Sequence, residues 1–142
     1  MTAEQNKAVV RRFFEAFEAN DLAAMKEVLA PDLVAYTHGQ PVPTGREAML
    51  QAINDWNASF ETHYTIDEQI AEGEKVATRL TMRAIHNGRE FQGAPASGKQ
   101  TEVSSITIER IKDGKIVERR VISDWYGMMQ QLGLVPPPQP VR

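Results

Sequence analysis

The residues that could carry out chemistry begin with an aspartate near the end of the chain. Asp124 follows a strand-like run, residues 115–123, and precedes a short helical pattern that Gly133 ends. Beside Trp125 and Met128, a carboxylate at the mouth of a pocket would lose water, which raises its pKa toward the range of a general base. An equally simple interpretation is that Asp124 caps the following helix. The sequence therefore predicts Asp124 as a base, a cap or both.

Four other polar side chains are candidates for acting on a substrate. His86 shares the apolar parity of its predicted strand, so its imidazole could relay a proton or orient a substrate oxygen; the alternative is a structural histidine bonded to the following loop. Tyr36 and His38 lie in a turn-rich segment, where they could polarise a carbonyl group or face solvent. We assign His86 and Tyr36, with Asp124, to catalysis. We assign His38, and His63 at the start of a strand, to substrate contact.

Large apolar side chains are predicted to form the walls of the pocket. Aromatic rings offer wide contact surfaces, although core packing is the alternative interpretation for Trp56 and Phe60. The predicted apolar substrate contacts are Trp56, Phe60, Met82, Val121, Trp125 and Met128.

The composition argues against several other classes of function. The chain has 142 residues, a formal net charge of −3 and no cysteine. Without a broad basic field it is a poor partner for nucleic acid. Its three histidines are scattered, and it has neither a glycine-rich phosphate loop nor a nucleophile elbow. We therefore expect no metal and no cofactor.

The sequence also predicts where the protein works. The start of the chain lacks the basic and apolar regions of a signal peptide. No apolar run approaches the roughly 20 residues that a membrane-spanning helix needs, and the absence of cysteine fits a reducing compartment. We expect a cytoplasmic protein that does not enter a membrane.

The elements that must position these residues begin with three helices. Thr2 and Gln5 form a capping-box pattern ahead of a first amphipathic helix. Asp21 is the predicted N-cap of a short second helix, and Thr44 that of a third. After residue 60 the apolar period changes from helical to alternating, which predicts strands for most of the remaining chain.

The predicted strands follow one another as a meander. In the first, Tyr64, Ile66 and Ile70 are expected to share one apolar face. An Asp-Gly hairpin signal at 113–114 joins the last two strands, 101–111 and 115–124. We expect a single domain over residues 1–142, with a proline-rich tail at 136–142.

Several short motifs follow one another along the chain. They include Pro31-Asp32, Thr44-Gly45-Arg46-Glu47, Glu72-Gly73-Glu74, His86-Asn87-Gly88, Lys112-Asp113-Gly114-Lys115 and Gln131-Leu132-Gly133. Their order and spacing are similar to those of the SnoaL-like polyketide cyclases of the nuclear transport factor 2-like superfamily. That resemblance implies an α+β, cone-shaped, barrel-like fold, with three N-terminal helices packed on a curved, mostly antiparallel sheet around one pocket. It also implies a bulky, apolar substrate and a homodimer formed through the open face of the sheet.

The resemblance breaks down at the residues that carry the family's chemistry. Its catalytic aspartate falls on Val121 and its histidine on Thr107, so cyclisation here requires another base. The leading hypothesis is a cofactor-independent enzyme that cyclises or isomerises a bulky, hydrophobic carbonyl compound by proton transfer, with Asp124 as the base. A non-catalytic binding protein and a hydrolase or hydroxylase are the alternatives; for hydrolysis, the inner-sheet candidates are Asp67 and Arg79. Arg119 and Arg120 are expected on a solvated or dimer-facing surface, unless one turns inward to hold an anionic substrate group.

Overall fold

The computed structural model describes residues 1–136 and contains four helices and six strands. Of the expected proline-rich tail, residues 137–142 lie outside the described part. In chain order the elements are α1 Ala3–Ala19, α2 Leu22–Val28, β1 Leu29–Thr37, β2 Gln40–Pro41, α3 Arg46–Ser59, β3 Phe60–Glu72, β4 Lys75–His86, β5 Gln100–Lys112, β6 Lys115–Ser123 and α4 Trp125–Gln131.

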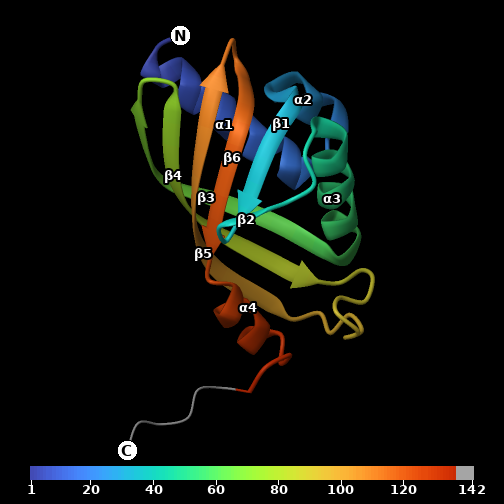
Figure 1. Cartoon of the computed structure of the whole chain (residues 1–142). Coiled ribbons are helices and arrows are strands. Elements are labelled where there is room, and N and C mark those ends of the chain that lie inside the picture. Colours follow the sequence, from blue (N-terminus) through green and yellow to red (C-terminus); the bar gives the residue numbers. More distant parts are fainter. Residues whose placement is uncertain (137–142) are drawn as a thin grey trace, which may run out of the picture.

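The strands form one curved sheet in the order β2-β1-β6-β5-β4-β3, and its two edges do not join (Figure 1). Strands β3 to β6 are the predicted antiparallel meander, whereas β1 pairs with β6 in parallel. Helix α1 packs across β3 to β6, α3 packs against β1 and β3, and α4 packs against β5. The predicted α+β cone is therefore confirmed, with a mixed sheet.

Of the three N-terminal helices, two begin with the predicted cap. The Thr2 side chain accepts a hydrogen bond from the Gln5 amide, and Asp21 accepts one from the Ala24 amide. For the third helix the expected cap, Thr44, is wrong: the N-cap is Gly45, and no side chain caps the helix. Gly45 has a φ of 100°, which a residue with a Cβ rarely adopts.

The expected face of β3 is corrected by a bulge. The pairing of β3 with β4 shifts register between Ile66 and Glu68, and an extra residue in one strand exchanges the two faces beyond it. Tyr64 and Ile66 pack against the core as predicted, whereas Ile70 is 66% exposed.

The apolar core lies between α1 and the inner face of the sheet. Its centre is Phe13, which is fully buried and makes edge contacts with Phe14 and Phe17 at 5.4 and 6.2 Å between ring centroids. A second cluster, including Phe60 and Met128, fills the end of the sheet beneath α4. Among residues 1–136, no helix combines the length and the apolar character that crossing a lipid bilayer requires.

Candidate functional site

Two adjoining cavities lie inside the cone. The first, of about 150 Å³, lies between α1 and the inner face of β4, β5 and β6. The second, of about 320 Å³, lies between α3 and β1. Phe17, Trp56 and Arg119 line both cavities, so the two are neighbouring parts of one region. The second cavity is by itself large enough for a small-molecule ligand, since such ligands bind in pockets of about 300–1,000 Å³.

Side chains of β5 and β6 give the first cavity a row of hydroxyl groups. Ser105, Thr107 and Ser123 line it, and the Ser105 and Ser123 hydroxyls are 2.8 Å apart and hydrogen-bonded. The opposite walls are apolar, with Phe14, Leu80 and Met82 among them. A ligand in this cavity therefore meets aromatic and aliphatic surface on one side and hydroxyl groups on the other.

A buried ion pair lies beside this row. Arg119 Nε is 3.2 Å from Glu109 Oε2, and the two side chains are 13% and 0% exposed. Neither of these two atoms has a well-directed hydrogen bond, so their attraction is that of an ion pair. The Arg119 guanidinium also lies 5.0 Å from the centre of the Phe13 ring and 5.8 Å from that of Phe14. Among residues 1–136, Arg119 is the one cation that lines both cavities, and these two rings pack against it.

Glu109 is the carboxyl group with the most altered acidity in this region. Burial raises its pKa to about 7, although the Arg119 charge and the hydrogen bond from the Thr107 hydroxyl, 2.8 Å from Glu109 Oε1, act to lower it. A carboxyl group with this pKa exchanges a proton near neutral pH, as a general base requires.

The raised pKa of Glu109 predicts how the stability of the protein depends on pH. The folded state holds this proton more tightly than the unfolded chain, so the contribution to stability is complete below pH 4.5 and is lost as the pH rises through about 7. Glu109→Gln stays neutral and escapes this loss. By calorimetry, the Tm of Glu109→Gln minus the Tm of the wild type should be roughly 5–8 °C larger at pH 8 than at pH 5. An unchanged difference between the two pH values would contradict the buried, titrating carboxyl group.

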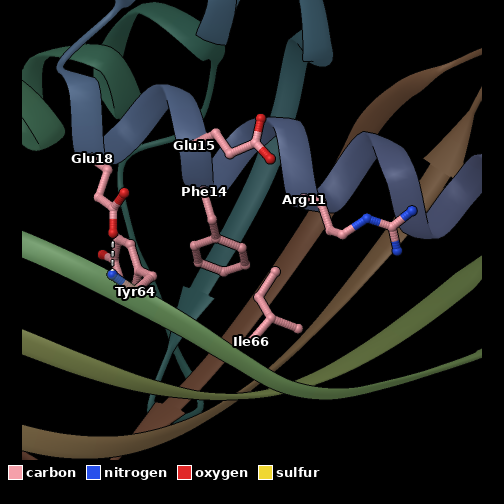
Figure 2. A pocket seen from close by; sticks show the side chains of 6 residues that line it. All are labelled: Arg11, Phe14, Glu15, Glu18, Tyr64 and Ile66. Atoms are coloured by element: carbon pink, nitrogen blue, oxygen red, sulfur yellow. Dashed lines mark hydrogen bonds between the residues drawn. The ribbon is translucent and has the colours of Figure 1, made fainter.

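Tyr64 lines both the first cavity and a groove between α1 and β3, and Figure 2 shows the residues that line the groove. Phe14 also lines both, and the Tyr64 ring lies 5.0 Å from Phe14 and 5.2 Å from Phe17. The Tyr64 amide donates a hydrogen bond to the Glu18 carboxylate. Burial raises the pKa of the Tyr64 phenol well above its usual range, so this phenol remains protonated at neutral pH.

Five of the residues expected from the sequence line the cavities. Trp56, Met82, Val121 and Trp125 line the first, and Tyr36 contributes to the lining of the second. The Tyr36 ring, however, packs under the Arg120 guanidinium, 4.0 Å away, and both residues belong to the outer face of the sheet.

Three other expected residues lie in the core behind the cavity wall. Phe60 stacks on Trp56 with ring centroids 4.3 Å apart, and Met128 is fully buried below it. His86 is 2% exposed; its Nε2 lies 2.8 Å from the Arg89 carbonyl oxygen, and its ring packs on Phe60. The structure therefore places His86 in contact with the loop that follows it rather than with a cavity.

The remaining expected residues lie on exposed surface. His38 Nε2 accepts a hydrogen bond from the Ser123 amide, and His63 lies beside Glu18 and Glu61. Asp124 is the N-cap of α4, accepting a hydrogen bond of 2.9 Å from the Gly127 amide. It lies beside a groove on the outer face of the sheet, so the structure does not bring Asp124 and His86 together.

The cap interaction gives a test of what Asp124 does. Asp124→Ala is expected to lower the free energy of unfolding by about 1 kcal/mol, because the first turn of α4 loses its acceptor. Asp124→Asn keeps an acceptor oxygen and should be close to the wild type in urea unfolding. Both variants should keep near-wild-type turnover; its loss in Asp124→Asn, with stability unchanged, would establish Asp124 as the base.

The sequence-based site omitted Glu109 and Tyr64, and it gave an inward-turned Arg119 or Arg120 only as an alternative to a position on the surface. Glu109 shares the parity of Val103, Thr107 and Ile111 on β5, which is the signal that could have placed it inside. Of the two neighbouring arginines, Arg119 turns inward and Arg120 outward.

The Asp67 and Arg79 considered for hydrolysis lie 3.5 Å apart with exposed or part-exposed side chains, so their assignment to the inner sheet is wrong.

Comparisons with known proteins agree with this architecture. The sequence profile of the SnoaL-like polyketide cyclases matches residues 7–132. The aklanonic acid methyl ester cyclase of Streptomyces peucetius is 32% identical over 132 residues, which cover 88% of each chain. The nogalonic acid methyl ester cyclase of Streptomyces nogalater is 28% identical over 123 residues, or 83% of this chain and 90% of that enzyme.

A solved structure extends the comparison to three dimensions. IdmH from Streptomyces antibioticus, a candidate polyketide cyclase, has a TM-score of 0.81 and 32% sequence identity, covering 91% of this chain and 99% of its own. Profile, sequence and fold coincide over nearly the whole described chain, and the protein therefore belongs to the SnoaL-like polyketide cyclase family.

Proposed function

We propose that the protein is a cofactor-independent cyclase that transfers a proton on a bulky, hydrophobic, polyketide-like carbonyl substrate. The observation that carries this proposal is the position of Arg119, a cation facing two apolar cavities beside the hydroxyl groups of Ser105 and Thr107. Ring closure between two carbonyl-bearing arms begins when a C–H bond next to one carbonyl is broken, and the enolate that forms needs a positive partner.

The walls of the cavities fit the substrate class. Trp56, Trp125 and Phe17 supply flat aromatic surface, which suits a planar, fused-ring compound. Tyr64 lines the same cavity with a phenol that remains protonated, so it can donate a hydrogen bond to a substrate oxygen. Arg119 can hold an oxygen that is partly or fully negative.

The test is incubation of the purified protein with aklanonic acid methyl ester and with nogalonic acid methyl ester, the compounds named for the two related cyclases. A cyclase should give a product of unchanged mass and altered absorption spectrum, faster than the rate without protein. A gain of one water would instead indicate a hydrolase, and a gain of one oxygen atom a hydroxylase. Binding of both esters, with intact ester recovered, would favour a non-catalytic binding protein.

The outer face of the sheet supports a further part of the proposal, that two copies form a homodimer. Ile106, Ile108 and Ile122 are 52%, 41% and 67% exposed there, and they line a groove of about 550 Å³. Ile106 and Ile122 are register partners, so their side chains form one apolar strip. A second copy is the proposed occupant because the strip is flanked by charges of both signs, including Arg79 and Asp124, which a two-fold axis can pair.

Light scattering on the purified protein tests the homodimer directly. The wild type should have the mass of two chains, and Ile122→Lys should have the mass of one because it places a charge in the apolar strip. A wild type with the mass of one chain at all concentrations would contradict the proposal.

A further inference from the structure

Glu109 is fully buried, yet it is one side chain away from the cavity. The Thr107 hydroxyl donates a hydrogen bond of 2.8 Å to Glu109 Oε1. Thr107 lines the first cavity, whereas Glu109 does not. The Thr107 side chain therefore lies between the first cavity and a carboxyl group that does not line it.

Within residues 1–136, Glu109 has one charged neighbour, Arg119. Across the strands, Val76 of β4 and Arg119 of β6 are its register partners. The buried face of α1 carries no ionisable side chain; its residues are Asn6, Val9, Val10, Phe13, Phe14, Ala16 and Phe17. When Glu109 gains a proton, the positive charge of Arg119 is no longer balanced, and a negative oxygen in the cavity can balance it instead.

We propose that Glu109 accepts, through the Thr107 hydroxyl, the proton that leaves the activated carbon of the substrate. The inference rests on the proposed function. In this step the C–H bond next to a substrate carbonyl breaks, and its electron pair forms an enolate whose oxygen is held by Arg119. The proton passes to Thr107 Oγ1 as the proton of that hydroxyl passes to Glu109 Oε1. When the enolate carbon attacks the second carbonyl, the proton returns by the same path to the new alkoxide, so no oxidant or co-reactant is needed.

This relay supplies a base in place of the family's aspartate, whose position is occupied in this chain by Val121. Thr107 and Val121 are register partners on β5 and β6, and both line the first cavity. A proton acceptor reached through Thr107 therefore acts at the same end of the cavity as a group at position 121. The raised pKa of Glu109, about 7, matches a base that must accept and return a proton at neutral pH.

The experiment measures proton abstraction apart from ring closure. The probe is 2-tetralone, a bulky aromatic ketone with acidic C–H bonds, and the readout is the rate of hydrogen–deuterium exchange in D₂O by NMR. Glu109→Gln and Thr107→Val should lower the exchange rate by about 10²-fold or more, the usual contribution of a general base. Their dissociation constants for the ketone should stay close to that of the wild type. The wild-type rate should rise with pH through about 7, and this rise should be missing in Glu109→Gln.

Two control variants separate the relay from packing. Thr107→Ser keeps the hydroxyl and should restore most of the exchange lost in Thr107→Val. Thr101→Val removes a buried hydroxyl of the same strand that bonds the Ala84 carbonyl oxygen and lines neither cavity, and it should leave the exchange rate unchanged.

The outcomes distinguish this inference from the proposed function. Wild-type exchange in Glu109→Gln, or a rise with pH that survives in it, overturns the relay and leaves the cyclase proposal standing. Exchange that depends on Glu109, without ring closure of either methyl ester, supports the relay and overturns the proposed substrate. A wild type that binds the ketone without exchanging its protons overturns the relay.

Discussion

Arg119→Met is expected to lower kcat/KM for the cyclisation by about 10²- to 10³-fold, the usual cost of removing a group that stabilises a developing oxyanion. Methionine keeps much of the length and packing against Phe13 and Phe14 but removes the charge that, within the described part of the chain, is alone in facing both cavities. Without that charge the enolate has no positive partner in a space lined largely by apolar groups. The measurement is steady-state kinetics with the methyl ester that the wild type converts.

The loss of Arg119 also leaves Glu109 buried without its partner, so activity and folding must be separated. Breaking a buried ion pair is costly when the remaining charge stays ionised. Glu109 avoids much of this cost because its pKa, already raised by burial, rises further without the arginine. Arg119→Lys keeps a positive charge but lacks the planar guanidinium group with its several donors, so it should recover part of the activity. Wild-type kinetics in a folded Arg119→Met would contradict the proposed oxyanion site.

Phe13→Ala is expected to have the largest effect on stability, lowering the free energy of unfolding by roughly 3–5 kcal/mol. Phe13 is fully buried at the contact of α1 with the sheet, and its ring touches those of Phe14 and Phe17. The substitution leaves a cavity and removes the surface on which the Arg119 guanidinium lies. The same variant should therefore also lose activity under conditions in which it remains folded.

Chemical unfolding in urea measures this loss, and Tyr126→Ala is the matched control. Tyr126 is an aromatic residue of α4 that is 57% exposed, so its truncation should change the free energy of unfolding by less than about 0.5 kcal/mol. Equal losses in the two variants would show that the core is not centred on Phe13.

The helices and the meander could be predicted because local rules decide them, and the cone because the order of the motifs resembles that of one family. The capping box at Thr2 and the Asp113-Gly114 turn signal are short-range features, and they act in the structure as the sequence indicates. Where contacts between distant parts of the chain determine which face a residue occupies, the local sequence pattern gives the wrong prediction. Ile70 faces outward because of a bulge that pairing with β4 produces, and no pattern in β3 alone marks it.

The site was harder to predict because β5 reverses the usual rule of burial. Its inward positions carry Ser105, Thr107 and Glu109, whereas Ile106 and Ile108 face outward. A search that equates apolar with inside therefore assigns the wrong face, and it overlooks the buried carboxyl group. The local sequence around Asp124 is compatible with two roles, because a carboxylate that follows a strand can act as a base or as a helix cap. Only the three-dimensional position separates it from the inner cavities.

The parallel pairing of β1 with β6 has a consequence for how the chain folds during synthesis. Val34 lies opposite Glu118, so β1 leaves the ribosome long before its partner strand β6 is made. Contacts of such wide sequence separation slow folding, since a large loop must close before they form. The three helices and β1 therefore leave the ribosome with their apolar faces uncovered, and the cavity that holds Arg119 is completed last. Newly made chains should depend on chaperones until β6 is released.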